Sequence, residues 1–353
     1  MTAAKEPRVS TTTQQARVED PASAPPKRPS VFRRILTWVG VQNLSLIIAL
    51  IVLVVIIGSQ DPNFFRVQNL IAIGTSITVF GILAIVQTLV ILLGALDISV
   101  GSVAGLTSVV TAMIFTATGS SAAGVVAALV AGLACGLLNG VIIIYGRVNA
   151  VIATLATLAA YKGLAQILSG GRSQGYTGDD SFFTALARGT WLGIPVLIWI
   201  FASVALVTGL VLKYTDIGRN VYAIGGNPTA ARLSGMNLNR YIIGVYIIVG
   251  TVAGLAGILL TARTGSGQPV SGSEGLELEA ITAAALGGAA LTGGKGTITG
   301  TVLAVILLGV LSNGLTVLGV NPFWQNVAKG ALLVVAIVIQ QRRSGQRAVG
   351  LPA

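Results

Sequence analysis

The sequence predicts an all-α membrane protein, a polytopic bundle of about ten transmembrane helices with both termini in the cytoplasm. Of its 353 residues, 54% are hydrophobic and only 9% are charged, whereas about 25% of the residues of a soluble domain are charged. The apolar residues form repeated runs that could cross a bilayer as helices, which takes about 20 residues. The net charge of +11 comes from basic residues in short loops beside those runs. That placement indicates membrane topology and argues against nucleic acid as a partner.

Three parts follow one another along the chain. Residues 1–40 are polar and rich in Thr, Pro and Ala, so they cannot bury a core and are predicted to form a disordered cytoplasmic tail. Residues 41–341 form the membrane domain, which a polar cytoplasmic loop at 213–240 interrupts. Residues 342–353 form a second cytoplasmic tail.

Ten apolar runs are read as spans, with boundaries good to several residues. The first and the eighth are short, so each could be tilted, longer than its apolar run, or re-entrant. In order, the predicted spans cover residues 44–58, 69–93, 98–117, 122–145, 150–169, 191–212, 241–262, 276–291, 297–319 and 324–340.

Basic residues fix the predicted orientation. With the N-terminus inside and the spans alternating, sixteen Lys and Arg residues lie on the cytoplasmic side and four on the outside. This bias follows the positive-inside rule, and an even number of spans returns the C-terminus to the inside. Two further basic residues, Lys162 and Lys329, fall within spans. The outer residues could meet acidic groups of a docking protein; they are Arg66, Arg172, Arg188 and Arg263.

Several kinds of site are excluded. The chain has no histidine, and its single cysteine is Cys135, so it offers no Ser-His-Asp triad, no intrachain disulfide and no thiolate cluster. The glycine-rich stretch 288–296 misses the spacing of an ATP-binding P-loop, because Gly288 stands one position too far from Gly294-Lys295. We therefore expect no metal and no cofactor in this chain. If ATP drives transport, Mg-ATP must bind to a separate ATPase polypeptide.

Glycines at spacings of four predict close helix packing. Gly132, Gly136 and Gly140 lie along one predicted span, and Gly250 and Gly254 lie along another. Small residues at this spacing let two helix backbones approach each other. These glycines are therefore assigned to packing.

The polar loop contains signals for a short helix. Asn227-Pro228 opens the segment 229–233, which ends at Gly235. Asn as N-cap, Pro at the first helical position and Gly beyond the end are helix start and stop signals. We predict a two-turn helix on the cytoplasmic face, where a soluble partner could push. The alternative is an ordinary connecting loop, which is basic because cytoplasmic loops usually are.

Asp97 is an acid at the border of two predicted spans with almost no loop between them. An ionisable group at membrane depth often serves a transport pathway. It could equally cap the following helix, where its charge suits the helix dipole. Ser99 and Ser102 add hydroxyl groups to the same turns.

Lys162 stands within the fifth predicted span. Thr154, Thr157 and Tyr161 share one helical face near it, so a polar strip could line a route for a hydroxylated solute. Alternatively, Lys162 extends towards the outer interface and Tyr161 belongs to an interfacial aromatic belt.

Four stretches in collinear order resemble one family. They are 94–106 (GALDISVGSVAGL), 151–172 (beginning VIATLATLAAYKGL), 218–237 (GRNVYAIGGNPTAARLSGMN) and 277–301 (ELEAITAAALGGAALTGGKGTITGT). Each is similar to a motif of the ribose/xylose/arabinose-type ABC transporter permeases. The resemblance covers about residues 44–340, nearly the whole membrane portion.

The resemblance implies the permease subunit of a sugar importer in the bacterial plasma (inner) membrane. Such subunits pair with a second permease copy, identical or related, and work with an ABC ATPase and an extracytoplasmic sugar-binding protein. The implied ATPase-coupling residues are Gly225, Gly226, Asn227, Pro228, Ala231, Arg232, Leu233 and Gly235. Those assigned to the translocation pathway or gate are Asp97, Ser99, Gly101, Thr154, Thr157, Tyr161 and Lys162.

Alternatives to a sugar permease remain open at this point. An ion-coupled secondary transporter would need intramembrane carboxylates, and Asp97, Glu277 and Glu279 are the candidates. The branched-chain amino acid permeases are related, but their early glycine- and asparagine-rich motif is not evident here. A non-transporting membrane scaffold is a third possibility. No enzyme chemistry is apparent.

Overall fold

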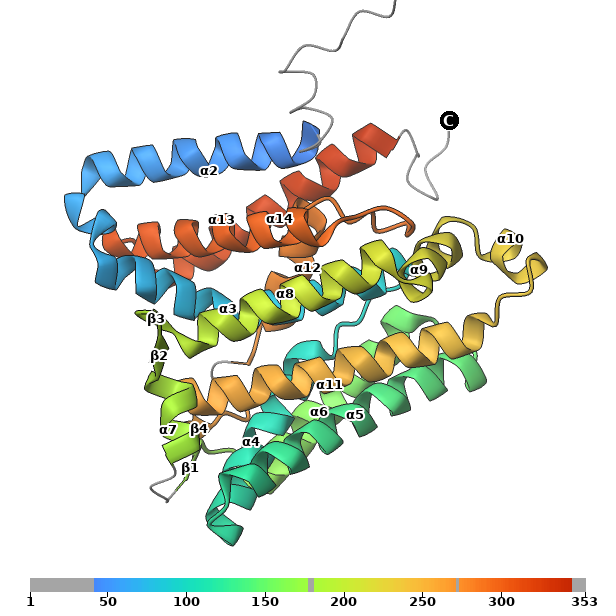
Figure 1. Ribbon diagram of the computed structural model, residues 1–353, viewed down its shortest axis with the longest axis horizontal. Helices are drawn as coiled ribbons and strands as arrows, with labels where there is room; N and C mark the ends of the chain where they lie inside the picture. Colours follow the sequence, from blue (N-terminus) through green and yellow to red (C-terminus); the bar gives the residue numbers. More distant parts are fainter. Residues whose placement is uncertain (1–40, 177–180, 271–272, 345–353) are drawn as a thin grey trace, which may run out of the picture.

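The computed structural model describes residues 41–176, 181–270 and 273–344. The predicted N-terminal tail and most of the predicted C-terminal tail lie outside these residues. The described chain is a bundle of helices (Figure 1), so the all-α prediction is confirmed. Strands in the described residues form two short antiparallel pairs, β1 (Gln174–Gly175) with β4 (Ser266–Gly267) and β2 (Thr190–Trp191) with β3 (Ile194–Pro195).

Eight helices among the described residues are long and apolar enough to cross a membrane. They correspond to eight of the ten predicted spans. The first predicted span, 44–58, was short, but its helix α2 is longer because it begins at Val41 and ends at Gln60. The eight are α2 (Val41–Gln60), α3 (Val67–Leu92), α4 (Val100–Thr118), α5 (Ser121–Tyr145), α6 (Ala150–Ser169), α8 (Val196–Tyr214), α11 (Leu238–Thr264) and α13 (Ile298–Val317).

The eighth predicted span, 276–291, is wrong as a continuous helical span. Its helix α12 (Leu276–Leu286) has eleven residues, a length of about 16 Å against a hydrocarbon core of about 30 Å. Glycines limit it on both sides, since Gly275 precedes it with φ +83° and Gly288 follows with φ +94°. Residues 276–291 are therefore a half-length helix followed by turns.

The tenth predicted span corresponds to α14 (Pro322–Ser344), a helix of 23 residues. This length suits a crossing. The helix continues past residue 342, where the C-terminal tail was predicted to begin.

Backbone packing centres on α3 and on the pair α5–α11. Nearly all of α3 is buried inside the bundle, whereas α2 lies mostly on its outside. A methyl group on Gly136 would lie 3.1 Å from the Cα of Gly250, and one on Gly132 would lie 3.0 Å from the Cα of Gly254. The predicted packing role of these glycines is confirmed.

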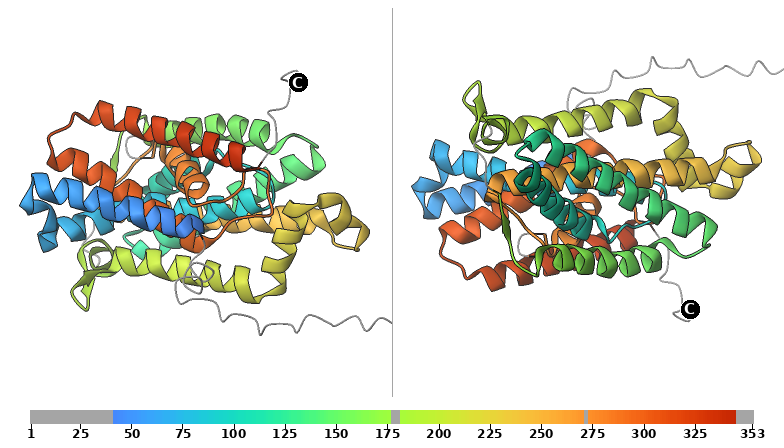
Figure 2. Two further views of the ribbon diagram at one scale, coloured as in Figure 1. Left: turned by 90° about the horizontal axis from the view of Figure 1, so that it is seen from above. Right: turned by 90° about the horizontal axis from the view of Figure 1, so that it is seen from below.

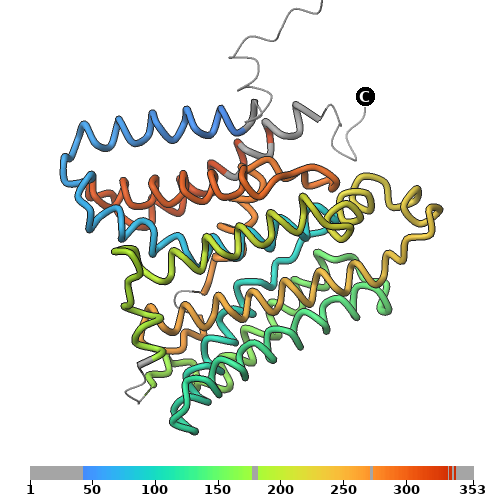
Figure 3. Tube along the Cα trace, viewed as in Figure 1, coloured from blue at the N-terminus to red at the C-terminus, as the bar shows by residue number. Residues whose placement is uncertain are grey.

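The two ends of the bundle carry different elements (Figures 1 and 3). One end, called here the strand end, carries the short helices η1 (Pro62–Phe65) and α7 (Ser181–Arg188) together with β1–β4. The opposite end carries α9 (Asp216–Gly226) and α10 (Pro228–Leu233) and is called the α9–α10 end. Figure 2 shows α6 and α14 on one flank of the bundle and α8 on the opposite flank.

Candidate functional site

The predicted two-turn helix is present as α10. The side chain of Asn227 caps it by accepting a hydrogen bond from the backbone N–H of Ala230 at 3.0 Å. Pro228 occupies the first helical position, and Gly235 follows the end with φ +83°. The preceding helix α9 was read from the sequence as part of a polar loop. The Thr215 hydroxyl caps it by accepting from the N–H of Gly218 at 3.3 Å.

The outer face of α10 is exposed. Leu233 is 85% exposed, and Arg232, Asn227 and Pro228 are also exposed, whereas Ala231 is buried against the bundle. The helix therefore presents one apolar and one basic side chain beyond the α9–α10 end.

Four glycines join the end of α9 to two links between other helices. A methyl group on Gly225 would lie 2.8 Å from the backbone nitrogen of Gly294 and would also meet the carbonyl group of Leu92. One on Gly293 would lie 2.6 Å from the carbonyl oxygen of Gly225 and 2.9 Å from the Cα of Gly94. We call Gly94, Gly225, Gly293 and Gly294 the glycine junction. It puts α9 in backbone contact with the α3–α4 link and the α12–α13 link.

Two hydrogen bonds close the glycine junction. The N–H of Gly294 donates to the carbonyl oxygen of Leu92 at 2.9 Å. The hydroxyl of Tyr222 in α9 donates to the carbonyl oxygen of Gly296 at 2.8 Å. Helix α9 therefore contacts backbone atoms of both links directly.

Asp97 lies three residues beyond the junction, in a buried hydrogen-bonded cluster. Its carboxylate accepts from the backbone N–H of Ser99 at 2.8 Å and from the Ser99 hydroxyl at 2.6 Å. The Asn139 amide of α5 donates to the same hydroxyl at 2.8 Å. The Tyr161 hydroxyl of α6 donates to the Asn139 carbonyl oxygen at 3.0 Å. The cluster thus ties the start of α4 to α5 and α6.

The backbone around Asp97 is also held by other helices. Thr154 of α6 accepts from the N–H of Ile98 at 3.2 Å, and Tyr246 of α11 donates to the carbonyl oxygen of Leu96 at 3.4 Å. The amide of Gln87 in α3, in the orientation that satisfies its hydrogen bonds, pairs with the backbone N–H and carbonyl of Asp97. This arrangement favours the structural interpretation of Asp97, although Ser99 occupies the N-cap position of α4.

The pathway residues predicted from the sequence fall into two groups. Thr157 is buried like the residues of the Asp97 cluster, and its hydroxyl donates to the carbonyl oxygen of Thr154 at 3.3 Å. Gly101 lies in the first turn of α4 against Glu277 of α12. Lys162 is separate from the cluster, because its ammonium pairs with the carboxylate of Glu274 at 2.8 Å.

Sequence reasoning missed several members of these groups. Gln87, Asn139 and Tyr246 join the Asp97 cluster, and Glu274 pairs with Lys162. Asn139 carried a usable signal, since it stands next to Gly140 of the packing stripe and its polar side chain had to face another helix.

The four arginines predicted to dock a partner are all exposed and belong to helix ends or links at the strand end. Arg66 precedes α3, Arg172 follows α6, Arg188 ends α7 and Arg263 lies in the last turn of α11. The guanidinium of Arg263 is partly engaged, donating to the carbonyl oxygen of Ser76 at 3.3 Å.

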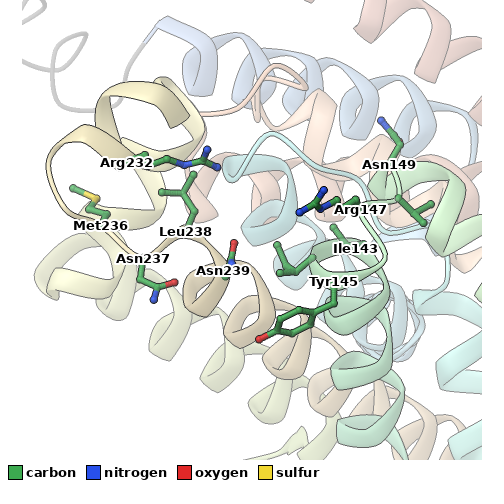
Figure 4. Close-up of a pocket in the computed structure, with 11 residues that line it drawn as sticks. Ile143, Tyr145, Arg147, Asn149, Arg232, Met236, Asn237, Leu238 and Asn239 are labelled. Atoms are coloured by element: carbon green, nitrogen blue, oxygen red, sulfur yellow. The ribbon is translucent and has the colours of Figure 1, made fainter.

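A basic pocket of about 1030 Å³ lies beside α10, between the α5–α6 link and the start of α11. Figure 4 shows the side chains of Arg147 and Arg232 pointing toward one another across it. Within the described residues there is no cluster of three or more His, Cys, Asp or Glu side chains that could hold a metal ion.

Comparison with known proteins identifies the family. The sequence pattern described as "Branched-chain amino acid transport system / permease component" matches residues 69–337. The chain belongs to this permease family. Among curated members, it is 40% identical to the ribose import permease protein RbsC of Escherichia coli strain K12, over 88% of this chain and 97% of that protein. It is 38% identical to the L-arabinose transport system permease protein AraH of the same strain, over 92% of this chain and 96% of that protein.

Other members of the permease family are nearly as similar. The ribose import permease protein RbsC of Bacillus subtilis strain 168 is 37% identical over 86% of this chain and 94% of its own length. No solved structure matches the chain. The resemblance found in the sequence motifs is thus confirmed, and with eight candidate spans the chain is a multi-pass membrane protein.

Proposed function

We propose that the protein is the permease subunit of an ATP-driven, binding-protein-dependent importer that moves a monosaccharide across the bacterial plasma membrane. The observation that carries this proposal is 40% identity to a ribose import permease over nearly the full length of both chains. Relatives that import ribose and L-arabinose make a pentose the first substrate to test.

The α9–α10 end is the surface on which we place the ATPase subunit. Leu233 supplies an apolar contact there, and Arg232 supplies a positive charge that suits acidic side chains of a partner. The neighbouring basic pocket, with Arg147, extends this positive surface. Mg-ATP is bound and hydrolysed on the ATPase, not on the permease.

The contacts of the glycine junction support alternating access as the transport mechanism. Movement of α10 with the ATPase displaces the end of α9, which contacts the α3–α4 and α12–α13 links through backbone atoms. Because these backbones are closely packed without voids, the two links move together with the end of α9. The helices that these links join then rearrange between states open to either side, with a second permease copy completing the pathway.

A sugar-binding protein delivers the solute at the opposite end. The exposed arginines of the strand end, Arg66, Arg172, Arg188 and Arg263, suit acidic groups on such a protein. Since the binding protein supplies affinity, the permease needs only a weak site in transit.

A charge reversal on α10 tests the proposal. In vesicles reconstituted with the permease, its ATPase and its binding protein, Arg232→Glu should abolish D-ribose uptake and sugar-stimulated ATP hydrolysis while leaving membrane insertion intact. Arg240→Glu makes the same charge change at an exposed residue in the first turn of α11, outside α10, and should retain both activities. Normal uptake by Arg232→Glu would contradict the docking surface.

The same vesicles discriminate the ion-coupled alternative. Uptake that needs ATP and survives a protonophore supports the importer. Uptake that is driven by an ion gradient in the absence of the ATPase would replace this proposal with a secondary transporter.

A further inference from the structure

A cavity of about 600 Å³, lined by both polar and apolar side chains, lies between α3, α12, α13 and α14. Its volume is within the range of small-molecule sites, roughly 300–1,000 Å³. Phe80 of α3 and Leu308 of α13 line it, and each stands near the middle of its helix. The cavity therefore lies at about half the length of α3 and α13.

Two Lys–Glu pairs accompany the cavity. The ammonium of Lys329 in α14 lies 2.5 Å from the carboxylate of Glu279, and Glu274, whose carboxylate pairs with Lys162 of α6, also lines the wall. The two ammonium groups and the two carboxylates give a net charge of zero. The Glu274 and Lys162 side chains are 66% and 35% exposed, which a hydrocarbon environment would not tolerate, because charged groups at membrane depth face water or protein.

The half-helix α12 begins at this cavity. Gly275, which precedes the helix, lines the wall together with Leu278 and Thr282 of its first two turns. Membrane transporters commonly place solute sites near the bilayer midplane at the ends of discontinuous helices. Residues 273–275 form a turn directly before α12, and Ser273 and Pro269 lie against Gly105 of α4.

The lining fits a neutral solute with many hydroxyl groups. Carboxylates accept hydrogen bonds from hydroxyls, and an ammonium group donates to them. Ser312 and Asn326 add a hydroxyl and an amide, while Phe80 and Leu308 offer apolar surface to C–H groups. A lining whose charges are internally paired gives no net attraction to an ion.

We infer that this cavity is the transit site for a neutral polyhydroxylated solute of monosaccharide size, held between the Glu279–Lys329 pair and the polar side chains of α13 and α14. This inference rests on the proposed function in one respect, namely that the solute is carried into the cell. It places the solute route along α12 and α14, away from the buried Asp97 cluster.

Cysteine labelling tests the site without depending on transport. Wild type gives the background, since its single cysteine Cys135 is buried. In membranes treated with a water-soluble cationic thiosulfonate reagent, Ser312→Cys should react readily. Val130→Cys should not react, because Val130 lies in the middle of α5, away from the cavity. Its side chain is 59% exposed on the outside of this membrane-spanning helix. D-ribose or L-arabinose at high millimolar concentration should slow the Ser312→Cys reaction several-fold, and trimethylamine N-oxide at the same concentration should not.

Charge variants give a second readout. Glu279→Gln and Lys329→Met should each lower uptake by more than about tenfold, because removing one partner leaves the other charge unpaired in a low-dielectric site. The double variant Glu279→Lys with Lys329→Glu should recover much of the uptake at equal protein levels in the membrane. Full uptake by both single variants would overturn the inference.

The outcomes separate this inference from the proposed function. An unreactive Ser312→Cys, or labelling that neither sugar slows, overturns the transit site even if wild type imports ribose. Protection by sugar in a protein that shows no ATP-driven uptake supports the transit site and rejects the importer.

Discussion

A methyl group at Gly225 is the sharpest perturbation of the glycine junction. It would lie 2.8 Å from the Leu92 carbonyl carbon and 2.8 Å from the Gly294 nitrogen, and it would meet the Leu92 carbonyl oxygen as well. Optimal separation of such atoms is about 3.5–4.0 Å. Its three nearest neighbours are all backbone atoms, so no rotation of a side chain can relieve these contacts and the links themselves must shift.

The structure sets the size of the effect. Overpacking of a close contact costs about 1–3 kcal/mol, and the better helix propensity of Ala offsets at most about 1 kcal/mol at this penultimate residue of α9. We expect a net cost of about 1–2 kcal/mol for Gly225→Ala. If that cost falls on one transport state only, the balance between states changes by roughly 5–30-fold.

The assay compares Gly225→Ala with Gly244→Ala in reconstituted vesicles. A methyl group at Gly244 of α11 has no atom within 4 Å beyond its own helix backbone and chain neighbours, so this variant should keep its melting temperature and its D-ribose uptake. Gly225→Ala should melt at a lower temperature and lose uptake, while basal ATP hydrolysis by the ATPase continues.

One result would refute the reasoning. If Gly225→Ala matched Gly244→Ala in both melting temperature and uptake, the backbone contacts of the glycine junction would not transmit movement from α9.

Two further predictions concern local hydrogen bonds. Asn227→Ala removes the N-cap of α10 and should destabilise that helix by about 1 kcal/mol, which amide hydrogen exchange would show as faster exchange at α10. The control Asn237→Ala removes the cap of α11 and should leave exchange at α10 unchanged. Unaltered exchange in Asn227→Ala would contradict the capping role. Tyr161→Phe removes the hydroxyl that donates to buried Asn139 and should cost about 1–3 kcal/mol, measured as a lower melting temperature. Tyr145→Phe, at a position 72% exposed, is the control, and equal melting of the two variants would show that the Asp97 cluster does not need this hydrogen bond.

The sequence alone determined eight of the membrane helices, the short helix α10 and the two glycine stripes that allow close helix packing. Each of these follows from neighbouring residues. A run of apolar side chains needs a bilayer or a core, the order Asn-Pro to Gly sets helix ends, and glycines four apart share one helix face.

Only the tertiary structure decided the partners of the polar groups within the bundle. Lys162 pairs with Glu274, 112 positions away, and Lys329 pairs with Glu279, 50 positions away. Hydropathy could not reveal that α12 is half a helix, because its apolar run continues through the glycines that end it. Pairing and packing depend on which helices lie side by side, and residues close together in the chain carry no record of that arrangement.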